Sequence, residues 1–156
     1  RSRRQRQMCI RDRFLLAGDL DIDNPTGLNL QDLDKIRNEG YVEILGFHRD
    51  ITSLYAISNI ICLPSYREGT PRSVLEAMSV GRPIITTNTA GCKETVEDGI
   101  NGLLVPIKDS KSLAFAMKKM IEFNDNKINE MANESIKLVR KKYDVRKEKM
   151  GTKFKG

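Results

Sequence analysis

Short apolar runs alternate with amphipathic stretches along the whole chain, and this alternation limits the fold more than any other feature. The runs predict five strands, at residues 14–17, 42–45, 60–63, 84–87 and 103–105. Strands that are apolar along their whole length are typical of parallel sheets, which are buried on both faces. Strands that alternate with helices indicate crossover connections. The sequence therefore predicts the α/β class: a Rossmann-like parallel sheet with helices on both faces.

Capping residues mark the ends of the predicted helices. Asn29 is expected to cap a short helix with Asp32 at its third position, and Gly40 to end it. Asp109 is expected to cap a helix that runs to about residue 123. A last helix is predicted at residues 127–142, with four residues on one face: Ile128, Met131, Ser135 and Leu138.

Ligands of parallel α/β sheets bind beyond the carboxyl ends of the strands. One such end, after residue 63, leads into a loop and then a helix predicted at residues 73–80. Thr70 fits the N-cap position and Pro71 the first helical position. The free amides would then be those of the loop and first turn, which together form an anion site: Gly69, Thr70, Arg72, Ser73 and Val74.

Two carboxylates flank this predicted anion site. Glu76 lies about one turn into the helix, too far along to cap it, and is placed to accept both hydroxyls of a ribose. Glu68 lies in the loop and could accept the hydroxyls of a sugar. A phosphate between two hydroxyl-bearing groups is the chemistry of a nucleotide-sugar.

The net charge of +6 suggests nucleic acid as a partner, but its distribution argues against this. Residues 1–13 carry six Arg and one Asp, and without them the excess of basic residues falls to one. Residues 3–13 also resemble one translated frame of a common sequencing adapter, so we interpret residues 1–13 as a non-native segment. The alternative is a basic arm that binds phosphate or acidic lipid.

The remaining composition predicts one domain at residues 14–150 and a tail at 151–156. There is no apolar run of about 18 residues and no apolar core of a secretory signal. The single His48 excludes a histidine-based metal cluster. Cys62 and Cys92 have no ligand spacing, and unpaired thiols favour a reducing, cytoplasmic setting.

Residues 63–105 contain the pattern P-S-x-x-E-G-x-P-x-x-x-L-E-A-M-x-x-G-x-P-I-I. This segment resembles the donor-binding, C-terminal half of GT-B glycosyltransferases, and is most similar to the retaining family 4. The E-x7-E motif of that family corresponds to Glu68 and Glu76. The resemblance covers residues 14–144.

The resemblance implies roles for these residues. Glu68 would contact the donor sugar as the catalytic position, and Glu76 would bind ribose. The sugar and diphosphate would be held by Gly69, Thr70, Pro71, Arg72, Ser73 and Val74. The base would pack near Gly46, Phe47, His48 and Arg49. The resemblance further implies retention of anomeric configuration, with no cofactor and no metal.

A family enzyme is much longer than this chain. Its N-terminal half binds the acceptor, and its C-terminal half begins one strand and one helix earlier, with an Arg and a Lys that clamp the diphosphate. The resemblance therefore implies an N-terminally truncated donor-binding fragment, inactive alone, whose partner is the missing N-terminal half.

The sequence variants around the motif look like bacterial enzymes of capsule or O-antigen lipopolysaccharide assembly, which act on lipid-linked acceptors at the inner membrane face. We expect a UDP-linked hexose or N-acetylhexosamine as donor. The basic cluster at residues 140–149 is the solvated face of a helix or a peripheral membrane contact. The alternative function is a non-catalytic nucleotide or phospho-ligand module of flavodoxin-like fold, although such a site has no use for two hydroxyl-binding carboxylates.

Overall fold

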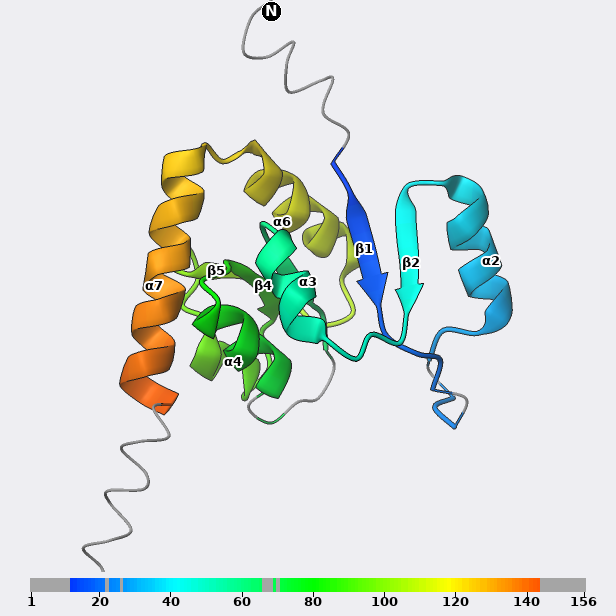
Figure 1. The fold of residues 1–156 in the computed structure, drawn as a ribbon, viewed down its shortest axis with the longest axis horizontal. Coiled ribbons are helices and arrows are strands. Elements are labelled where there is room, and N and C mark those ends of the chain that lie inside the picture. Colours follow the sequence, from blue (N-terminus) through cyan, green and yellow to red (C-terminus); the bar gives the residue numbers. More distant parts are fainter. Residues whose placement is uncertain (1–11, 22, 26, 66–68, 70, 144–156) are drawn as a thin grey trace, which may run out of the picture. The chain divides into compact units, whose positions relative to one another are not determined.

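The computed structural model describes residues 12–143 except 22, 26, 66–68 and 70. The chain forms two compact units, residues 1–50 (unit 1) and 51–156 (unit 2) (Figure 1). No helix among the described residues is long and apolar enough to cross a bilayer.

Unit 1 is a strand–helix–strand crossover. β1 (Phe14–Ala17) and β2 (Val42–Gly46) pair in parallel, and α2 (Leu30–Glu39) connects them. The predicted caps of α2 are confirmed: Asn29 and Asp32 form a reciprocal capping box, and Gly40 ends the helix with a φ of 72°. No described residue of unit 1 is buried.

Unit 2 carries a parallel three-stranded sheet in the order β3-β4-β5. Its elements are α3 (Ile51–Ile57), β3 (Ile61–Leu63), α4 (Arg72–Ser79), β4 (Ile84–Thr87), α5 (Cys92–Thr95), β5 (Gly102–Val105), α6 (Ser110–Glu122) and α7 (Asp125–Tyr143). All four residues of the central strand β4 are buried, as expected of a parallel strand covered on both faces.

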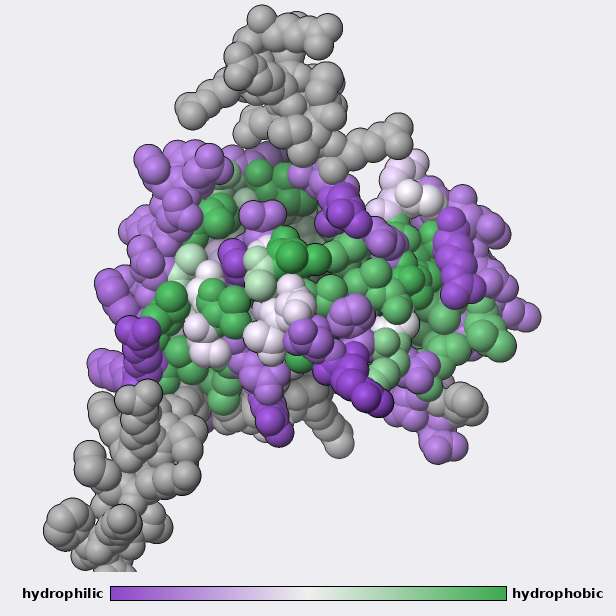
Figure 2. All heavy atoms as spheres, viewed as in Figure 1, coloured by the Kyte–Doolittle hydropathy of each residue, from purple (hydrophilic) through white to green (hydrophobic). Residues whose placement is uncertain are grey.

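Two hydrophobic clusters cover the two faces of β4. Ile84 packs on one face with Val74 and Met78 of α4, and Ile85 packs on the other with Met120 of α6 and Met131 of α7. Figure 2 shows the outer side of α7 as hydrophilic, with hydrophobic residues on the side toward α4. The predicted α/β class, with helices on both sides of a parallel sheet, is confirmed.

Helix α7 is fixed to the rest of unit 2 by a buried serine. The Ser135 hydroxyl donates to the carbonyl oxygen of Arg82 at 2.9 Å and lies 3.4 Å from that of Asn101. Arg82 in turn donates to two carbonyl oxygens in the last turn of α3, those of Tyr55 and Ala56. These bonds join α3, α7 and the turn after α4.

Some element boundaries differ from the predicted ones. β2 includes Gly46, one residue beyond the predicted strand, and α7 begins at residue 125 instead of 127. Asn124 accounts for the earlier start of α7, because its side chain accepts the Lys127 amide at 2.8 Å in the manner of an N-cap. Asp109 caps α6 as predicted.

Candidate functional site

The chain that leaves β3 is held by two threonines of β4. The Thr86 hydroxyl donates to the Leu63 carbonyl oxygen at 2.8 Å. The Thr87 hydroxyl donates to the Ser65 carbonyl oxygen at 2.5 Å and accepts the Ser65 amide at 3.0 Å. Both threonines are buried, so they fix where the loop toward Glu68 begins. Their role was missed from the sequence, where they fitted a strand and carried no other signal.

Helix α4 begins at Arg72, one residue before the predicted range 73–80 but one residue after the start that the predicted cap implies. Its N-cap is Pro71, with φ −74° and ψ 116°, so Thr70 is not the N-cap and Pro71 is not the first helical residue. A proline φ suits both positions, which is why the sequence pattern did not separate them. The Pro71 side chain supplies no cap hydrogen bond.

The first turn of α4 offers fewer free amides than predicted. The Val74 amide donates to the Pro71 carbonyl oxygen at 3.1 Å, and the Val74 side chain is fully buried in the core. This corrects the expectation that Val74 presents an open amide. Arg72 and Ser73 occupy the first two positions of α4, where amides have no partner within the helix.

Glu76 lies one turn into α4, as predicted, and its side chain is 37% exposed. Its Oε1 accepts a hydrogen bond from Arg72 Nε at 2.9 Å. Tyr55 of α3 is buried, and its pKa is raised first by burial and then by the negative charge of Glu76. The Glu76 carboxylate therefore lies near a buried residue of α3 as well as beside Arg72.

Two predicted site residues, Glu68 and Thr70, lie outside the described residues. Gly69 is exposed, and a Cβ added to it would meet nothing within 4 Å. Their proposed roles toward a sugar stay predictions.

The predicted base-binding residues belong to unit 1. Gly46 ends β2 with a φ of 67°, a backbone conformation that favours glycine, and its carbonyl oxygen accepts the Gly18 amide at 2.9 Å. Phe47 is 72% exposed, and His48 and Arg49 are exposed as well. An exposed aromatic beside a glycine turn suits base stacking, and this role also stays a prediction.

The loop after β4 turns tightly at the same end of the sheet. The Thr89 amide donates to the Thr87 carbonyl oxygen at 2.8 Å, and the Lys93 amide donates to that of Thr89 at 2.9 Å. The Thr89 hydroxyl oxygen is buried and has no hydrogen-bond partner among the described residues. The loop lies directly after the carboxyl end of β4.

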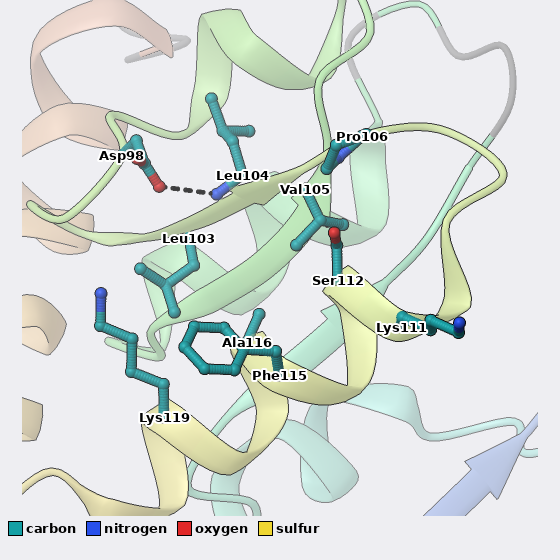
Figure 3. A pocket seen from close by; sticks show the side chains of 10 residues that line it. All are labelled: Asp98, Leu103, Leu104, Val105, Pro106, Lys111, Ser112, Phe115, Ala116 and Lys119. Atoms are coloured by element: carbon teal, nitrogen blue, oxygen red, sulfur yellow. Dashed lines mark hydrogen bonds between the residues drawn. The ribbon is translucent and has the colours of Figure 1, made fainter.

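A pocket of about 430 Å³ lies elsewhere in unit 2, between β5 and α6. Figure 3 shows Leu103 and Val105 on the side of β5 that faces Phe115 and Ala116 of α6. The Asp98 carboxylate accepts the Leu104 amide at 2.9 Å beside this pocket. None of the residues predicted to bind a donor lines it.

The fold agrees with comparisons to known proteins. Residues 3–122 match the family described as Glycosyl transferases group 1, and the chain belongs to this family. Its structure matches GT-B glycosyltransferases in fold. The match begins inside residues 1–13, and the interpretation of that segment as non-native stays a prediction.

Individual relatives are similar over most of this chain. An N,N'-diacetylbacillosaminyl-diphospho-undecaprenol alpha-1,3-N-acetylgalactosaminyltransferase of Campylobacter jejuni is 35% identical over 116 residues, which are 74% of this chain and 30% of that protein. A UDP-Gal:alpha-D-GlcNAc-diphosphoundecaprenol alpha-1,3-galactosyltransferase of Escherichia coli is 29% identical over 109 residues, 70% of this chain and 28% of that protein.

A solved structure, Anabaena Alr3699/HepE in complex with UDP, is 26% identical with a TM-score of 0.77. The match covers 89% of this chain and 39% of that one. The chain thus spans about a third of the length of these relatives.

Proposed function

We propose that this chain is the donor-binding part of a retaining family 4 glycosyltransferase. It would bind a UDP-linked hexose or N-acetylhexosamine for transfer to a lipid-linked glycan in cell-surface polysaccharide synthesis. The observation that carries the proposal is the start of α4, where the partly exposed Glu76 carboxylate lies one turn beyond the first amides of the helix. The UDP complex of HepE and the diphospho-undecaprenol acceptors in the names of two relatives support the donor and the acceptor.

Each site residue has a defined task in this proposal. Glu76 accepts the ribose hydroxyls, and the first amides of α4, with the helix dipole, hold the diphosphate. Glu68 contacts the sugar, and the loop at residues 46–49 receives the base. The acceptor half belongs to a part of the enzyme that this chain does not include.

The start of α4 also fits the charge changes of the reaction. The bond between sugar C1 and the β-phosphate oxygen breaks, and its electron pair leaves with UDP. The acceptor oxygen bonds to C1 and its proton is released. Amides at a helix N-terminus stabilise the charge that grows on the departing diphosphate, so a binding site of this kind lowers the barrier as well as holding the donor.

Calorimetric titration of UDP, GDP and UDP-N-acetylglucosamine into the 156-residue chain tests this proposal. We expect binding that prefers uridine nucleotides and that Glu76→Ala weakens by roughly ten-fold or more, because charge-assisted hydrogen bonds to two hydroxyls are lost. Glu122→Ala is the matched control, since Glu122 is an exposed carboxylate at the end of α6. Equal binding by the Glu76→Ala variant, or no binding by a folded chain, would contradict the proposal.

A further inference from the structure

The carboxylate assigned to ribose is occupied by a cation of its own helix. Arg72 Nε lies 2.9 Å from Glu76 Oε1, one turn apart on α4. The two side chains differ in freedom: that of Arg72 is 92% exposed, and that of Glu76 is 37% exposed. The pair therefore joins a nearly free guanidinium to a more confined carboxylate.

A ribose that binds Glu76 has to compete with this guanidinium. An exposed ion pair one helical turn apart changes an equilibrium by only about two-fold, because water solvates both partners well. Such a pair exchanges easily when another anion is offered. Arg72 is the first residue of α4, so its side chain is attached at the N-terminus of the helix, the end where anions bind.

We propose that Arg72 exchanges partners when the donor binds, leaving Glu76 to the ribose hydroxyls and moving to the diphosphate. This inference rests on the proposed function and adds a selectivity to it. A nucleoside diphosphate gives the guanidinium a new and stronger partner. A nucleoside displaces the guanidinium from Glu76 but has no phosphate for it to bind. Arg72 therefore favours phosphorylated ligands over nucleosides.

The test compares UDP with uridine by NMR titration of the 156-residue chain. In Arg72→Gln we expect UDP to bind roughly three- to ten-fold more weakly, since an exposed charge-assisted contact is lost. Uridine should bind equally well or up to about two-fold more tightly, since its competitor is gone. Arg72→Lys keeps a cation. Compared with Arg72→Gln it should recover part of the UDP affinity, and its affinity for uridine should equal that of the wild type.

The control variant is Lys137→Gln, which removes an exposed ion pair with Glu134 on α7 (2.7 Å). It should leave both affinities unchanged. The salt dependence of UDP binding should also become less steep in Arg72→Gln, because one charge pair is lost. An equal loss for UDP and uridine would show that Arg72 merely orients Glu76, and unchanged affinities would show a solvated surface charge; either result overturns the inference.

The outcomes also separate this inference from the proposed function. If the wild-type chain binds neither ligand, the proposed function fails and the inference fails with it. If UDP binds and Glu76→Ala abolishes the binding, the donor site stands. The exchange is then judged by whether Arg72→Gln weakens the binding of UDP without weakening that of uridine.

Discussion

At the scale of single residues, Gly102 of β5 lies very close to the backbone of β4. A Cβ built on Gly102 would lie 1.9 Å from the Ile84 carbonyl oxygen and 2.8 Å from the carbonyl carbon. These are backbone atoms of the neighbouring strand, so the contact cannot be relieved by a side-chain rotation. Any other residue at this position has to push β4 and β5 apart.

We therefore expect Gly102→Ala to lower the free energy of unfolding by about 3 kcal/mol or more, measured by urea denaturation. Gly99→Ala is the matched control, because Gly99 has a φ of 79° but open space around its Cβ position. Its cost should be about 1–2 kcal/mol, from backbone strain alone. Equal effects of the two substitutions would show that the strands can separate at little cost.

Cys62 of β3 gives a second prediction at this scale. Burial raises the pKa of its thiol from 9.0 to about 11. At pH 8 the folded chain should therefore react with iodoacetamide at Cys62 up to about 100-fold more slowly than the urea-unfolded chain, because only the thiolate reacts.

The rate in the folded chain should rise as the pH goes from about 9 to about 11. The free energy of unfolding should also fall across this pH range, because the thiol of the unfolded chain loses its proton near pH 9 and that of the folded chain only near pH 11. Below about pH 9 both states keep the proton, and this contribution to stability is fully present. Peptide mapping separates Cys62 from Cys92, which is fully buried. Labelling of Cys62 at pH 8 at the rate of the unfolded chain would contradict this prediction.

At the scale of elements, the docking of α7 depends on Ser135. Ser135→Ala removes the hydroxyl that donates to the Arg82 carbonyl oxygen. We expect it to lower the free energy of unfolding by about 1–2 kcal/mol, because a partly buried carbonyl loses a partner. Asn133→Ala, at an exposed position of the same helix, should change it by less than about 0.5 kcal/mol. Thermal unfolding of the two variants measures the difference, and an equal change in both would show that apolar packing alone holds α7.

Local patterns predicted the elements well and the contacts between them poorly. The apolar runs located the strands, and the buried face of α7 was found from the spacing of Met131 and Ser135. Hydrogen bonds such as that from Thr87 to Ser65 join residues 22 positions apart, and no local pattern contains them. The start of α4 was misplaced by one residue because Pro71 suits two positions. The roles of Glu68 and Glu76 were argued from their positions on either side of the helix start and from a family resemblance, and they await the binding experiments.

At the scale of the whole molecule, the two units differ in how well they are buried. Unit 2 contains two clusters of buried residues, whereas none of the described residues of unit 1 is buried. Amide hydrogens of β1 and β2 should therefore exchange with solvent faster than those of β4, because local opening of unit 1 exposes less apolar surface. Hydrogen-exchange mass spectrometry of the native chain measures this, and equal protection of β2 and β4 would contradict it.

The outer edge of β5 has a consequence for how copies of this chain meet. The backbone hydrogen-bonding groups of residues 103 and 105 point toward β4. Those of Gly102 and Leu104 therefore point away from β4, toward the outer edge of the sheet. The Gly102 carbonyl oxygen accepts the Gly99 amide at 2.8 Å, Asp98 accepts the Leu104 amide, and Pro106 has no amide hydrogen to offer. An unpaired strand edge can pair with a strand of another copy of the chain, which leads to aggregation. On this side of unit 2 the Gly102 carbonyl oxygen and the Leu104 amide already have partners within the chain, so they are not available to pair with a neighbouring strand.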